Sequence, residues 1–75
     1  MTIVLEHYKA SDGIEATIEQ DKYQTTFSID VYEPDGSGRP GFARSIYRNT
    51  YMTRDGARRA IQRRLSAPVT RTVYR

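Results

Sequence analysis

Alternating apolar and polar residues mark the first half of the chain as a series of strands. The segment 14–19 places isoleucine and alanine on one side and glutamate and threonine on the other. The segment 23–32 alternates over a longer stretch, with aromatic and β-branched residues at its odd positions. Such two-residue periodicity is typical of half-buried strands. Residues 3–8 are also rich in strand-forming residues, so three strands are predicted here, with turns at 9–13 and 20–22.

The second half of the chain predicts a fourth strand, a helix and a closing strand. A Gly- and Pro-rich loop at 34–41 leads into the segment 42–51, whose two faces differ less clearly. Thr53 has the character of a helix N-cap. An apolar stripe at helical spacing follows it, formed by Ala57, Ala60, Ile61 and Leu65. Pro68 ends the helix, and residues 69–74 have room for an edge strand.

This order of elements predicts an α+β fold in a single domain over residues 1–75. We expect an antiparallel sheet of four to five strands, in the order β-β-β-β-α with room for a C-terminal strand, and one helix packed on one face. One helix covers only one side of the sheet, so the other side faces water or a partner. Because so small a core barely offsets the chain entropy, a homodimer is a further option.

Composition excludes several kinds of chemistry. The chain has 75 residues, no cysteine and one histidine, His7, which we interpret as a strand residue at the sheet margin. We therefore expect no disulfide, no metal site and no cofactor. No nucleophile is held by a second group, so we expect no catalysis. With neither a long apolar run nor a secretory signal pattern, we expect no membrane association and a cytoplasmic location.

Charge is distributed unevenly along the chain, whose formal net charge is +3. Residues 1–38 carry eight acidic and two basic residues, whereas residues 39–75 carry ten arginines and one acidic residue. Two interpretations remain open. The halves can pair their charges across neighbouring strands, or the molecule can present two electrically distinct faces.

The first functional hypothesis places a protein-binding surface on the side of the sheet opposite the helix. If the apolar sides of 14–19 and 23–32 meet the helix, carboxylates and a tyrosine occupy the other side, which Tyr8 also joins. The candidate residues are Glu6, Glu15, Glu19, Asp30 and Tyr32. Carboxylates attract a basic surface, and tyrosines are favoured interface anchors. This predicts a non-enzymatic binding module or inhibitor that docks on a basic surface of a partner protein, with an ordinary solvated sheet face as the alternative.

The second hypothesis is a nucleic-acid-binding domain. Arginines at helical spacing can contact backbone phosphates, with support from arginines of the fourth strand. The candidate residues are Arg44, Arg48, Arg54, Arg58, Arg59 and Arg63. An ordinary solvated helix face is the alternative to this hypothesis.

Two resemblances bear on these hypotheses. The segment 23–65 contains an aromatic-rich strand, a Pro-Asp-Gly turn region, a basic strand and the run Thr-Arg-Asp-Gly-Ala-Arg-Arg-Ala-Ile. This layout resembles the sheet-plus-helix DNA-binding domain of phage-type tyrosine recombinases, which implies a sheet that enters the major groove. In size and lack of cysteine the chain also resembles the small anti-CRISPR proteins of phages, which implies an inhibitor of a nucleic-acid-handling complex. Carboxylates on the sheet repel phosphate, so we favour a protein partner.

Overall fold

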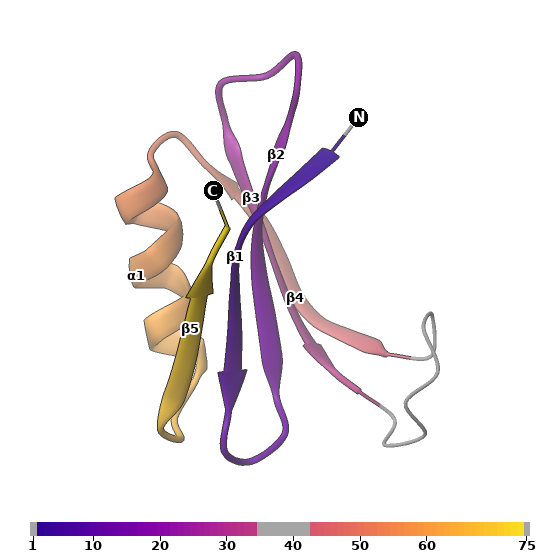
Figure 1. Cartoon of the computed structure of the whole chain (residues 1–75), viewed down its shortest axis with the longest axis vertical. Coiled ribbons are helices and arrows are strands. Elements are labelled where there is room, and N and C mark those ends of the chain that lie inside the picture. The colour runs from indigo at the N-terminus through magenta and orange to yellow at the C-terminus, as the bar shows by residue number, and fades with distance from the viewer. Residues whose placement is uncertain (1, 35–42, 75) are drawn as a thin grey trace.

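The computed structural model describes residues 2–34 and 43–74. Over these residues the chain forms five strands and one helix: β1 (Thr2–Ala10), β2 (Glu15–Asp21), β3 (Phe27–Glu33), β4 (Arg44–Tyr51), α1 (Arg54–Arg64) and β5 (Val69–Val73) (Figure 1). The strands form one sheet in the order β4-β3-β2-β1-β5, and all neighbours are antiparallel. The predicted α+β class is confirmed. Apart from Pro34, the predicted loop 34–41 lies outside the described residues.

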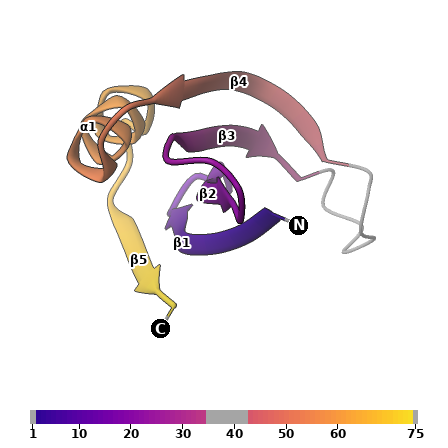
Figure 2. The same cartoon turned by 90° about the horizontal axis from the view of Figure 1, so that it is seen from above.

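The helix carries the chain from one edge of the sheet to the other. The strands β1 to β4 follow one another in space, whereas β5 returns to pair with β1. The view from above shows α1 between the end of β4 and the start of β5 (Figure 2). The predicted closing strand therefore forms, and it pairs within the chain.

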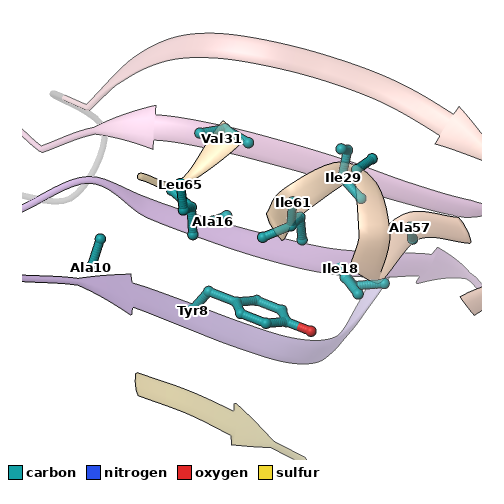
Figure 3. Packing of buried hydrophobic residues seen from close by; sticks show 10 residues of the cluster. Tyr8, Ala10, Ala16, Ile18, Ile29, Val31, Ala57, Ile61 and Leu65 are labelled. Atoms are coloured by element: carbon teal, nitrogen blue, oxygen red, sulfur yellow. The ribbon is translucent and has the colours of Figure 1, made fainter. Parts of the chain in front are cut away.

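The core lies between α1 and the three inner strands, β1 to β3. Ala57 and Ile61 of the helix are fully buried, and Leu65 lies just after its last turn. They pack with the apolar residues of β1 to β3 shown in Figure 3, namely Tyr8, Ala10, Ala16, Ile18, Ile29 and Val31. The predicted helix stripe is thus the surface that covers the sheet. Burying a large aliphatic side chain of this kind contributes about 2 kcal/mol.

Thr53 is the N-cap of α1, as the sequence predicts. Its Oγ1 atom accepts a hydrogen bond from the backbone N–H of Gly56 at 3.0 Å. This bond satisfies one of the N–H groups that the first turn leaves without a helical partner. The helix ends at Arg64, ahead of Pro68.

The third strand is shorter than its alternation predicts. It begins at Phe27 rather than at Tyr23, whose side chain is 84% exposed. The backbone N–H of Tyr23 donates to Oδ1 of Asp21 at 2.9 Å. An aspartate that binds the backbone two residues ahead forms a turn, and this local bond competes with extension of the strand.

The first strand contains an irregularity that reverses the direction of its side chains. Val4 lies opposite Glu19 and Glu6 lies opposite Ile18, so Leu5 is an extra residue between two regular stretches. One extra residue moves all following side chains to the other face of a sheet. Glu6 and Tyr8 therefore face the helix, and the prediction that they share the opposite side is wrong.

Candidate functional site

We call the side of the sheet turned away from α1 the open face. Glu15 pairs with Tyr32 and Thr17 with Asp30 across β2 and β3, while Glu19 pairs with Ser28. The intervening pairs, such as Ile18 with Ile29, are buried under the helix. Because side chains alternate along a strand, the first set must project from the other side. The open face is thus formed centrally by Glu15, Thr17, Glu19, Ser28, Asp30 and Tyr32, and it includes four of the five residues predicted for protein binding.

A histidine–glutamate–tyrosine cluster lies on the open face. Nε2 of His7 is 2.7 Å from Oε1 of Glu15 and 3.4 Å from the hydroxyl oxygen of Tyr32. His7 lies opposite Thr17 on β1, a strand with a neighbour on each side. The interpretation of His7 as a margin residue is therefore wrong. Pattern analysis missed this cluster because its members come from three different strands.

The carboxylates of the open face have few hydrogen-bond partners among the described residues. Asp30 accepts a hydrogen bond from the Ser45 hydroxyl at 2.8 Å. Among residues 2–34 and 43–74, the ion pairs leave Glu15, Glu19 and Asp30 without an arginine partner. Basic residues do lie opposite two of them, Arg48 opposite Asp30 on β4 and Lys9 opposite Glu15 on β1, but neither forms an ion pair with its neighbour.

Tyr32 lies within the electrostatic field of these carboxylates. Its pKa is raised above the ordinary tyrosine value, first by burial and then by the negative charges of Glu15, Asp30 and Glu19. The phenol therefore remains protonated at neutral pH and can donate a hydrogen bond. A second tyrosine, Tyr74, follows β5 and is 52% exposed. Thr72 pairs with His7 of the open face, and Tyr74 follows two residues later. Because side chains two residues apart lie on the same side of a strand, Tyr74 lies beside the open face.

Glu6 belongs to a different site, under the helix. Its side chain is fully buried, and its carboxylate accepts hydrogen bonds from Arg54, Arg58 and the hydroxyl of Tyr8. Burial alone would raise the pKa of Glu6, but the hydrogen bonds from Arg58, Arg54 and Tyr8 outweigh it and lower the pKa to about 2. Glu6 is therefore a structural anion and cannot contact a partner from this position.

The arginines proposed to bind phosphate are divided among several environments. Arg54 and Arg58 are held by Glu6, and Arg44 lies 3.6 Å from Glu33. Arg48 is opposite Asp30, so it belongs to the open face. The exposed outer side of the helix retains Arg59 and Arg63.

A second group that the sequence did not reveal joins the helix to β4. The guanidinium of Arg64 stacks on the Tyr47 ring, with 3.7 Å between its central carbon and the ring centre. The Tyr47 hydroxyl contacts that of Tyr51 at 3.0 Å and accepts a hydrogen bond from Asn49 at 2.8 Å. This cluster fixes Arg64 against the sheet, which makes it a packing residue more than a free cation.

Comparison with protein-family models, curated proteins and solved structures finds no match to this chain. Within the described part of the chain, no helix has the length and apolar character needed to cross a bilayer. The same residues contain no group of three or more histidine, aspartate or glutamate side chains arranged to hold a metal ion.

Proposed function

We propose that this chain is a binding module or inhibitor that docks the open face of its sheet on a basic surface of a partner protein. On the side of the sheet opposite α1, which no helix in the described part of the chain covers, three carboxylates and a tyrosine lie together: Glu15, Glu19, Asp30 and Tyr32. The absence of an arginine partner for these carboxylates, within residues 2–34 and 43–74, carries the proposal. We expect no catalytic activity.

Charge and tyrosine would contribute to binding in different ways. Carboxylates on one face accelerate encounter with a basic surface, and this contribution weakens as salt is added. Tyr32 and Tyr74 would supply ring surface together with a hydroxyl group. The resemblance in size to anti-CRISPR proteins suggests a nucleic-acid-handling complex as the first partner to examine.

The nucleic-acid-binding alternative has less support from the geometry. Two of its four helical arginines, Arg54 and Arg58, bind a buried carboxylate. Arg48 projects from the open face beside Asp30, where the carboxylates repel phosphate. Arg44, Arg59 and Arg63 remain for phosphate contacts, and three arginines on different elements give only a weak, salt-sensitive interaction.

Affinity capture from a lysate of the source cells, with nuclease treatment, separates the two functions. Immobilised wild-type chain is compared with the double variant Glu15→Lys/Glu19→Lys and with the control Glu33→Lys. Glu33 is an exposed carboxylate on the same strand as Asp30, but its position alternates onto the helix side. We expect a nuclease-resistant partner that wild type and the control capture and the double variant loses. Capture that is equal for all three proteins, or that nuclease removes, would contradict the proposal.

A further inference from the structure

Thr17 is a buried polar residue at the centre of the open face. Its side chain is 8% exposed, and its Oγ1 atom is the buried side-chain polar atom without a hydrogen-bond partner among the described residues. Buried hydroxyl groups are nearly always hydrogen-bonded, because leaving one without a partner costs about 1–3 kcal/mol. No residue that the structure describes supplies a partner for this hydroxyl, which therefore points to a ligand.

The three carboxylates of the open face surround this hydroxyl. Asp30 is directly opposite Thr17 on β3, and His7 is directly opposite on β1. Glu15 and Glu19 lie two residues away on the same strand, one on each side. Side chains in opposite positions have Cβ atoms about 5 Å apart, and those two residues apart on one strand are about 7 Å apart. One side chain seated above Thr17 would thus reach all three carboxylates.

Several acceptor atoms around Thr17 remain unused. Glu15 is bonded to His7 through Oε1, and Asp30 to Ser45 through Oδ1. Within the described ranges, the second oxygen of each carboxylate and both oxygens of Glu19 have no side-chain hydrogen-bond donor. Together with the Thr17 hydroxyl, they are acceptors at neighbouring positions of β2 and β3.

We infer that Thr17 marks the seat of one arginine side chain of the partner protein, an inference that rests on the proposed function. A guanidinium presents five N–H donors in one plane, whereas an ammonium presents three around a point charge. The planar guanidinium can donate to several acceptors at once, so it suits the carboxylates of β2 and β3 and the Thr17 hydroxyl between them. The partner would therefore use arginine, rather than lysine, at the centre of its basic surface.

The test uses three blocked pentapeptides that differ only at the central residue, which is arginine, lysine or citrulline. Each is titrated into the isotopically labelled full chain while amide and methyl NMR signals are recorded. We expect the arginine peptide to bind weakly, with a Kd on the order of 1 mM, and to shift the signals of Thr17, Asp30 and Glu19 most. The lysine peptide should bind about fivefold more weakly, and the uncharged citrulline peptide should not bind.

Thr17→Val is the decisive variant because it keeps the β-branched shape and removes the hydroxyl. It should lose the fivefold preference for arginine over lysine, while Thr17→Ser should retain it. Thr50→Val, at an exposed position opposite Ser28, is the control and should behave as wild type. The same spectra report whether each variant is folded, and the serine variant tests the hydroxyl even if valine disturbs the sheet.

The outcomes separate this inference from the proposed function. Equal binding of the arginine and lysine peptides, unchanged in Thr17→Val, would overturn the arginine seat and leave a charged docking face intact. Concentration-dependent dimerisation that Thr17→Val abolishes would assign the seat to a second copy and also overturn the inference. Failure of the proposed function itself would instead appear as partner capture that survives Glu15→Lys/Glu19→Lys.

Discussion

Arg58 contacts both carboxylate oxygens of Glu6 through its Nε atom, at 3.0 Å to each. These residues are 52 positions apart in the chain, and their contact ties the first strand to the helix. Arg54 and the Tyr8 hydroxyl complete the set of donors. A buried carboxylate is tolerated only when it is paired and hydrogen-bonded. These three donors therefore allow Glu6 to be buried under the helix.

Glu6 should make the free energy of unfolding depend on pH in the acidic range. Its pKa falls from 4.5 to about 2 in the folded chain. A lowered folded-state pKa stabilises the protein above pH 4.5, and this contribution disappears as the pH falls through 2. From the shift we expect a loss of about 3 kcal/mol in the free energy of unfolding, measured by urea unfolding from pH 7 to pH 2.

The variant Glu6→Gln isolates this contribution from that of the other carboxylates. The difference in unfolding free energy between wild type and Glu6→Gln should shrink by about 3 kcal/mol as the pH falls to 2. A difference that stays constant with pH would show that folding does not change the pKa of Glu6.

Removal of Arg58 should destabilise the fold far more than removal of an arginine on the outer helix face. Arg58→Ala leaves the Glu6 carboxylate buried with fewer donors, which we expect to cost about 2–3 kcal/mol. The exposed residue Arg63 provides the matched control, and Arg63→Ala should change stability by less than about 0.5 kcal/mol. Urea unfolding at pH 7 measures both, and similar values for the two variants would argue against a structural role of the ion network.

Tyr8→Phe should cost about 1–2 kcal/mol, because it removes the hydroxyl that donates to Glu6 at 2.7 Å and keeps the buried ring. In wild type, burial first and then Glu6 raise the pKa of Tyr8 to about 12. A raised folded-state pKa stabilises the protein below pH 10, and this contribution is lost as the pH rises through 12. Absorbance titration of the phenols should therefore show a late transition in wild type that Tyr8→Phe lacks.

Ile61→Ala tests the packing of α1 on the sheet. Ile61 is fully buried between the helix and the central strands, so its truncation should cost about 2–4 kcal/mol. Ile46 on β4 is 50% exposed, and Ile46→Ala should cost less than about 1 kcal/mol. Thermal unfolding of the two variants distinguishes a helix packed as described from one that lies loosely on the sheet, for which both costs would be small.

Periodicity was sufficient to predict the sheet, the helix and its buried stripe. Residues 14–19 and 27–31 alternate cleanly, so the direction of Glu15, Glu19 and Asp30 followed from the pattern. The same reasoning failed for Glu6, because the extra residue Leu5 moves the side chains that follow it to the other face of the sheet. No local sequence pattern indicates this irregularity. Regular alternation would have placed Leu5 inward and Glu6 outward.

Contacts between distant parts of the chain were beyond the reach of sequence patterns. The bond between His7 and Glu15 depends on the register of β1 with β2, and that of Arg58 with Glu6 depends on where the helix crosses the sheet. The arginine spacing in the helix suggested a phosphate-binding face. Two of those arginines instead meet a carboxylate that the pattern had placed on the other side.

The affinity of the purified partner for Glu19→Lys, compared with Glu33→Lys, tests the central claim most directly. Both variants change the net charge equally, but Glu19 lies on the open face and Glu33 on the helix side. Calorimetric titration should give a Kd at least about tenfold weaker for Glu19→Lys and a value close to wild type for Glu33→Lys. Equal Kd values for the two variants would show that binding does not use the open face.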